Sequence, residues 1–138
     1  MNNNIDTRLI ISFSDIIKMF YQNKSEQLDV LNMKGSHCKI LHLIYDHNGK
    51  TQQEILKIAN ITKSTMSETI TEMENEGYIY KVKGTVDKRQ THIFLTPDGE
   101  SKAKFIDDCF NEYCAQLFKN FSPQQINQFM VLLGKISY

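Results

Sequence analysis

Residues 51–99 read TQQEILKIANITKSTMSETITEMENEGYIYKVKGTVDKRQTHIFLTPDG, and their hydrophobic period changes once, after Gly77. Before that glycine, apolar residues recur at spacings of three and four, as in helices, and after it they alternate, as in strands. Thr51 and Thr62 are each placed to cap a helix, and Asn60 tolerates the left-handed backbone of a sharp turn. The segment therefore predicts two short helices that meet at a tight corner and are followed by a β-hairpin.

The expected strands cover residues 78–83 and 91–95, joined by a loop over residues 84–90. A helix corner followed directly by a hairpin is the plan of the winged helix-turn-helix. In that plan the second corner helix, the recognition helix, enters the major groove of DNA, and the hairpin, the wing, reaches an adjacent groove. We therefore expect a mainly α fold (α+β) with a two-stranded wing, and a DNA-binding region over residues 36–96.

The outward face of the expected recognition helix supplies the first candidate site. Its inward face is set by Met66, Ile70 and Met73, at spacings of four and three. The residues left for DNA contact are Lys63, Ser64, Thr65, Ser67, Glu68 and Thr71. Hydroxyl groups bond phosphate oxygens and base edges, and a carboxylate can accept from a cytosine amino group. Ser and Thr at a helix start could equally be ordinary caps that need no ligand.

Several short motifs recur in a fixed order along this region. They are Glu54-Ile55, residues 61–67 (ITKSTMS), Gly77-Tyr78-Ile79, Asp87-Lys88-Arg89 and Leu95-Thr96-Pro97-Asp98-Gly99. This ordered set resembles the MarR family of bacterial transcription regulators, and the expected order of elements is similar along the whole chain. The resemblance implies a homodimer that binds a pseudo-palindromic double-stranded DNA operator, with one recognition helix per half-site. It also implies a repressor that a small-molecule effector releases from the operator.

The same resemblance assigns roles in the wing, where the candidate contacts are Lys83, Asp87, Lys88 and Arg89. It implies that Arg89 enters the minor groove and that Asp87 fixes its side chain. An arginine fits this role because a narrow minor groove has a strongly negative potential. The alternative is an ordinary solvated ion pair, which would contribute almost nothing to stability.

Long amphipathic segments flank the winged region. The spacing predicts a helix over residues 5–24, a loop or frayed turn over 23–35, a helix over 36–46, and two helices within 97–137. The outer helices carry more large apolar side chains than a small winged region can bury, so residues 5–24 and 97–137 are the expected dimerisation region. A monomer in which these helices close onto one another is the alternative. The 138 residues form one expected unit.

The charge balance restricts how such a protein could bind DNA. There are 16 basic and 16 acidic residues, so the net charge is zero and a polybasic binder is excluded. The charge is unevenly distributed, because residues 78–92 carry a net +3 and residues 63–76 a net −3. We therefore expect modest affinity, based on hydroxyl contacts and a wing arginine more than on general phosphate attraction.

The resemblance also implies a small aromatic or anionic effector, bound in a crevice between the winged region and the dimer helices. Candidate lining residues are Phe20, Tyr21, Tyr45 and Tyr113. Each of them could instead belong to the dimer interface or the domain core.

Other functions find weaker support in the sequence. Cys38 and His42 lie four residues apart and could offer two metal ligands, but two more would have to come from elsewhere, and a buried thiol beside a histidine is the simpler interpretation. No metal, cofactor or catalytic residue is expected, because phosphate loops, nucleophile elbows and zinc motifs are absent. Three cysteines, no signal sequence and no membrane span fit the cytoplasm. A metal- or thiol-responsive sensor and a winged protein-interaction module remain as alternatives.

Overall fold

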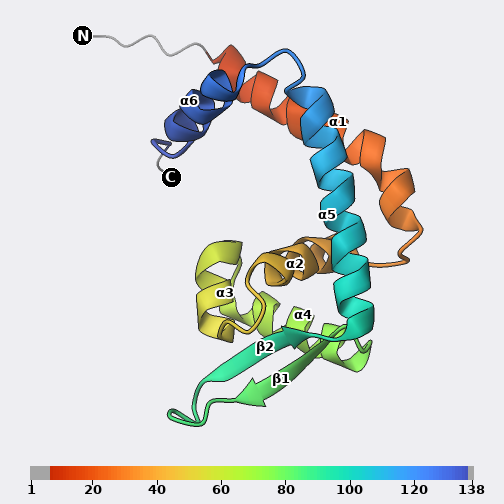
Figure 1. Cartoon of the computed structure of the whole chain (residues 1–138), viewed down its shortest axis with the longest axis vertical. Coiled ribbons are helices and arrows are strands. Elements are labelled where there is room, and N and C mark those ends of the chain that lie inside the picture. The colour runs from red at the N-terminus through yellow and green to blue at the C-terminus, as the bar shows by residue number, and fades with distance from the viewer. Residues whose placement is uncertain (1–6, 137–138) are drawn as a thin grey trace.

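The structure, a computed structural model, describes residues 7–136, except the side chains of residues 21 and 23–25. Its elements in chain order are α1 (Arg8–Asp29), α2 (Gly35–Asp46), α3 (Gln52–Ala59), α4 (Lys63–Asn75), β1 (Ile79–Lys83), β2 (Thr91–Leu95), α5 (Pro97–Leu117) and α6 (Pro123–Leu133). In Figure 1 the hairpin and α2–α4 lie at one end of the molecule, α1 and α6 lie at the other, and α5 runs between them. None of the described helices combines the length and apolar character that crossing a membrane would require.

Side-chain caps fix where most of these helices begin. The hydroxyls of Thr51, Thr62, Thr96 and Ser122 each accept a hydrogen bond from the backbone N–H three residues on, at the starts of α3, α4, α5 and α6. Thr51 and Ser122 form complete capping boxes. Between α3 and α4, Asn60 adopts the expected left-handed backbone with φ of 52°. The helix corner is therefore built from local sequence signals.

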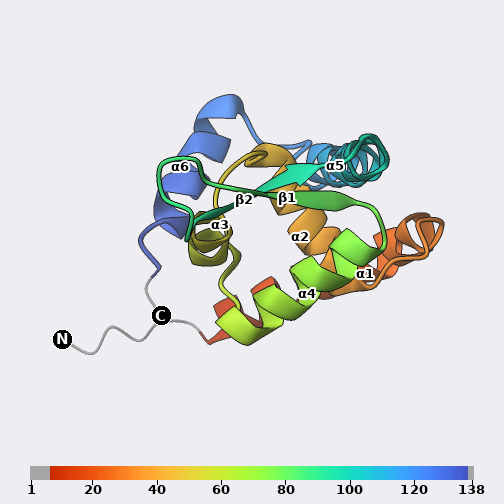
Figure 2. The ribbon, with the colours of Figure 1, turned by 90° about the horizontal axis from the view of Figure 1, so that it is seen from below.

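The wing is an antiparallel pair in which Ile79 lies opposite Leu95. Figure 2 shows this hairpin beside α3 and α4, seen from below. The connection between α2 and α3 joins its edge, because the Gly49 N–H donates to the Ile93 carbonyl at 2.8 Å and the Ile93 N–H donates to the Lys50 carbonyl at 3.0 Å. A bridge between Thr51 and His92 continues this pairing. The added edge covers backbone groups of β2 that a two-stranded hairpin would leave free.

The hydrophobic core lies between α2, α3, α4, the hairpin and the first half of α5. Met66, Ile70 and Met73 of α4 are at most 1% exposed, as their spacing predicts. They pack in one cluster with residues of the other elements, which include Leu41, Ile55, Ile79, Ile93 and Ile106. Burying one face of α4 in this way leaves its other face available to a ligand.

The Leu-Thr-x-x-Gly motif has a clear packing role at the start of α5. The Thr96 hydroxyl accepts from the Gly99 N–H at 3.0 Å and donates to the Gly77 carbonyl at 2.6 Å. A Cβ atom on Gly99 would overlap the carbonyl oxygen of Tyr78. The hydroxyl and the missing side chain together hold α5 tightly against the end of α4 and the start of β1.

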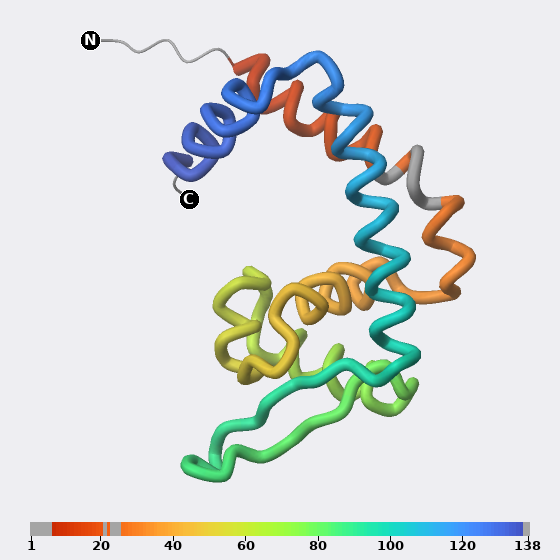
Figure 3. Tube along the Cα trace, viewed as in Figure 1, coloured from red at the N-terminus to blue at the C-terminus, as the bar shows by residue number. Residues whose placement is uncertain are grey.

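One predicted boundary is wrong. The sequence predicts a loop or frayed turn over residues 23–35, whereas α1 continues to Asp29 and the turn is confined to the residues that follow it (Figure 3). Lys24, Glu26 and Gln27 are good helix formers, so nothing in the local sequence ends the helix. Leu28, near the end of α1, packs against the core, and this contact stabilises the longer helix. The turn itself is made by Asn32, with φ of 50°.

Candidate nucleic-acid interface

The candidate contacts on the recognition helix all lie on its exposed side. They are Lys63, Ser64, Thr65, Ser67, Glu68 and Thr71. Some of their hydroxyls already have partners within the chain: the Thr65 hydroxyl lies 2.8 Å from that of Thr62, and the Thr71 hydroxyl donates to the Ser67 carbonyl at 2.8 Å. Gln52 of α3 donates to the Ser67 hydroxyl at 3.4 Å. These bonds leave acceptor lone pairs on the hydroxyls and restrain where they point.

The acidic residues of α4 divide into two groups. Glu72 bonds Lys34 and His37, and Glu74 pairs with Lys81 at 2.8 Å, so these carboxylates face other parts of the protein. Glu68, nearer the start of the helix, has no ion pair among the described residues. The net −3 counted along this helix therefore overstates the negative charge that a DNA ligand would meet.

The wing carries the arrangement that the resemblance implies. The Arg89 Nε donates to Asp87 Oδ1 at 3.1 Å and its Nη2 donates to Oδ2 at 3.3 Å, while the Arg89 backbone N–H also donates to Oδ1 at 3.0 Å. The hydrogen bonds from Arg89 hold the pKa of the Asp87 carboxyl below its ordinary range. The Arg89 side chain is nevertheless 91% exposed. Lys83 and Lys88 are exposed on the same hairpin.

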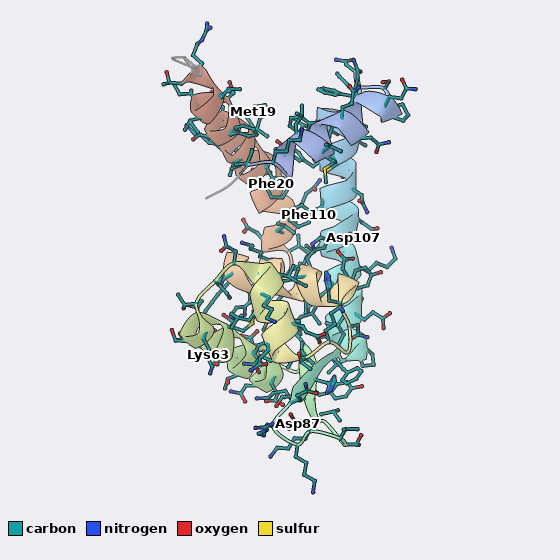
Figure 4. All side chains as sticks on the ribbon, turned by 90° about the vertical axis from the view of Figure 1, so that its left-hand side faces the viewer. Met19, Phe20, Lys63, Asp87, Asp107 and Phe110 are labelled. Carbon is teal, nitrogen blue, oxygen red and sulfur yellow. The ribbon has the colours of Figure 1, made fainter. Side chains whose placement is uncertain are left out.

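A hollow of about 440 Å³ opens between α3, the start of α4 and the wing. It is lined by Gln52, Gln53, Leu56, Lys63, Met66, Asp87, Arg89, Gln90 and Thr91. Figure 4 labels Lys63 and Asp87, which come from the two sides of this region. The cationic groups of Lys63 and Arg89 and the glutamine amides can donate hydrogen bonds to a phosphate oxygen in this hollow. The sequence does not identify Gln52 and Gln53 of α3 as candidate contacts. Their position in the first turn of the first corner helix is the only sequence signal for such a role.

Comparison with known proteins agrees with this architecture. The model of the MarR family matches residues 36–91, which run from α2 to the start of β2. Residues 36–91 of the chain are therefore similar to the MarR family. A transcriptional repressor of Bacillus subtilis, YetL, is 26% identical, with 96% of this chain and 83% of the relative covered. The Escherichia coli transcriptional regulator HosA is also 26% identical, with 91% and 93% covered.

Solved structures show the same fold. MepR of S. aureus in its DNA-binding conformation superposes with a TM-score of 0.84 at 24% identity, covering 92% of this chain and 94% of MepR. The MepR–DNA complex matches with a TM-score of 0.76 at 24% identity, covering 91% and 93%. The protein thus has the winged helix-turn-helix fold with long flanking helices.

The aromatic candidates for an effector crevice are placed differently from one another. Phe20 of α1 meets Tyr113 of α5 edge-on at 4.9 Å and stacks on Phe110 at 4.8 Å. Figure 4 shows Phe20 and Phe110 at the junction of α1 and α5. Tyr45 packs instead against the core of the winged region. The side chain of Tyr21 lies outside the described residues.

The Cys38 and His42 pair has other partners. Cys38 is 5% exposed, and burial raises the pKa of its thiol, which disfavours the thiolate that metals and oxidants need. His42 Nε2 lies 2.9 Å from Asp107 Oδ1, and its ring lies 4.8 Å from that of Phe110. Across the described chain, no group of three or more possible ligands could hold a metal ion. His42 thus links α2 to α5. The sequence alone could not predict this role, because Asp107 is 65 residues away.

Proposed function

We propose that the protein is a homodimeric repressor that binds a pseudo-palindromic double-stranded DNA operator, with one α4 helix in the major groove of each half-site. The observation that carries this proposal is the wing tip, where Asp87 holds the guanidinium of a 91% exposed Arg89 with both oxygens. The guanidinium points outward and its orientation is fixed by the carboxylate. This arrangement favours insertion into the negatively charged minor groove of DNA. The repressor YetL and the MepR–DNA complex support the same function.

The rest of the interface would divide into two kinds of contact. The exposed hydroxyls and Glu68 on α4 would meet base edges and phosphates, with Glu68 accepting from a cytosine amino group. The hollow between α3 and the wing would receive a backbone phosphate, bonded by Lys63 and by the amides of Gln52 and Gln53. Lys83 and Lys88 would add backbone contacts along the wing.

A second subunit would cover α1 and α6. Apolar side chains on these helices are exposed in the single chain: Leu9 at 52%, Ile10 at 74%, Met130 at 62% and Leu132 at 59%. An apolar surface of this extent marks an interaction site, and a symmetric dimer is the commonest way to bury it. The exposed faces also argue against a monomer in which the outer helices close onto one another. The dimerisation region would comprise residues 5–24 and 97–137, and the DNA-binding region residues 36–96.

An effector site would lie at the junction of α1 and α5, beside Phe20, Phe110 and Tyr113. Three aromatic rings favour an aromatic ligand. The charged group beside them is Asp107, paired with His42, so an anionic ligand is disfavoured at this place. Binding that separates α1 from α5 would change the spacing of the two recognition helices and release the operator. A DNA partner would require the protein to act in the cytoplasm.

The test is a gel shift on a duplex that carries the region upstream of the protein's own gene. We expect the wild type to bind at low salt and Arg89→Ala to bind about 10- to 100-fold more weakly, because a positioned groove contact contributes about 1–3 kcal/mol. Lys119→Ala, which removes one positive charge from the loop between α5 and α6, is the matched control and keeps wild-type affinity. If the wild type does not bind even at low salt, the winged protein-interaction module replaces this function.

A further inference from the structure

One carboxylate of the recognition helix, that of Glu72, bonds two residues at the start of α2. Glu72, in the third turn of α4, accepts hydrogen bonds from Lys34 Nζ at 3.1 and 2.9 Å, one to each oxygen. His37 Nε2 lies 2.7 Å from Glu72 Oε2. Lys34 is the N-cap residue of α2 and His37 belongs to its first turn. We call these residues, Lys34, His37 and Glu72, the α2–α4 clasp.

The histidine of the clasp is unusually enclosed. Its side chain is 2% exposed, whereas Glu72 is 35% and Lys34 64% exposed. Its second ring nitrogen, Nδ1, is buried without a hydrogen bond in the described chain and lies 3.5 Å from Glu76 Oε2. Both ring nitrogens therefore face carboxylates, one on α4 and one on the residue that follows it. A buried polar ring that is committed to one helix in this way is costly to displace, because moving α4 would leave the ring without its partner.

The clasp acts on the end of α4 that the DNA would not touch. The candidate base contacts occupy residues 63–71, and Glu72 follows them directly. The burial of Met66, Ile70 and Met73 fixes which side of α4 faces the core, but apolar contacts are non-directional and tolerate small rotations and slides. The three hydrogen bonds to the Glu72 carboxylate, two from Lys34 and one with His37, supply the direction that packing lacks.

We propose that the α2–α4 clasp is a positioning device that sets the orientation of the recognition helix, so that Glu72 supports DNA reading although it carries charge of the wrong sign for contact with DNA. The inference rests on the proposed DNA-binding function. The proposal predicts that removing the negative charge of Glu72 lowers the affinity for the operator. Removing a carboxylate near a DNA interface strengthens binding to all sequences through electrostatics, whereas loss of the clasp weakens binding to the operator.

The experiment compares full-length variants by fluorescence anisotropy on the operator and on a non-specific duplex of equal length, with thermal unfolding measured in parallel. For Glu72→Ala we expect operator affinity to fall at least tenfold while non-specific affinity stays within threefold or rises. His37→Leu, which removes the buried partner of Glu72 and leaves only the exposed Lys34, should behave in the same way. His37→Gln, whose amide can still donate to Glu72, should retain operator affinity within threefold. Asp29→Ala, which removes an exposed carboxylate at the end of α1, outside both the DNA-binding and the dimerisation regions, is the charge-matched control and keeps wild-type binding.

Two results would overturn the inference while the proposed function stands. In the first, Glu72→Ala binds the operator as well as the wild type or better. In the second, it loses operator and non-specific affinity in parallel with a lowered melting temperature, which is general destabilisation. A wild type that binds neither duplex would instead overturn the DNA-binding function itself, and the clasp's role with it.

Discussion

Glu72 gives the clearest pH dependence at the scale of a single residue. Its hydrogen bonds from Lys34, and then from His37, lower the pKa of its carboxyl from the ordinary 4.5. A group whose pKa is lower in the folded state stabilises the fold above its unfolded pKa, and this stabilisation is lost as the pH falls through the folded pKa. We expect the melting temperature of the wild type to exceed that of Glu72→Gln above pH 4.5, and the difference to shrink as the pH is lowered further. A difference that grows in acid would contradict this assignment.

The residues that the sequence could and could not predict differ in the separation of their partners. Asp87 and Arg89 are two residues apart, so a local motif contains the whole interaction. Glu72 needs partners 38 and 35 residues away, on an element that meets α4 only after folding. For the same reason, the net charge of −3 counted along residues 63–76 overstates the negative charge on the DNA-facing surface, because Glu72 and Glu74 are paired within the protein.

At the scale of elements, the contact between α5 and β1 yields a stability prediction. We expect Gly99→Ala to lower the free energy of unfolding by about 1–3 kcal/mol, because the added methyl group would overlap the Tyr78 carbonyl and push α5 away. Urea denaturation measures this change. Gly35→Ala, also in a helix, is the control, since a Cβ there meets no atom within 4 Å and stability should not fall. Equal losses in the two variants would refute the close-contact explanation.

Elements that begin with a capping side chain could be predicted, whereas elements defined by tertiary contact could not. Thr51, Thr62, Thr96 and Ser122 each satisfy backbone donors of their own helix, so their role is visible in the local sequence. The end of α1 depends on Leu28 reaching the core, and the edge pairing of Gly49 and Lys50 depends on where β2 lies. The core residues that Leu28 contacts and the Ile93 backbone that pairs with Gly49 and Lys50 are distant in sequence.

For the whole molecule, the distribution of charge predicts a limited salt dependence of operator binding. Each subunit offers Lys63, Lys83, Lys88 and Arg89 to DNA, and Glu68 opposes them. If every one of these cations in a dimer contacts a phosphate, the slope of log K against log salt is about −7, and Arg89 in a groove makes it shallower. We expect a slope smaller in magnitude than this, measured by anisotropy over a range of salt concentrations. A slope near −10 would show phosphate contacts outside the proposed interface.

Assembly of the dimer is the remaining property of the whole molecule that a single substitution can test. Leu132 of α6 is 59% exposed in the single chain, next to Val131 at 63%, and a partner subunit would bury both. Leu132→Glu would place an unpaired carboxylate in that contact, and burying such a charge costs several kcal/mol. We expect the variant to sediment as a monomer, with its winged region still folded by circular dichroism, and to lose operator binding. Ile58→Glu makes the same change at a 47% exposed residue of α3 and should leave the dimer intact. If both variants sediment as the wild type does, α6 lies outside the interface and the apolar face of α1 must be covered in another way.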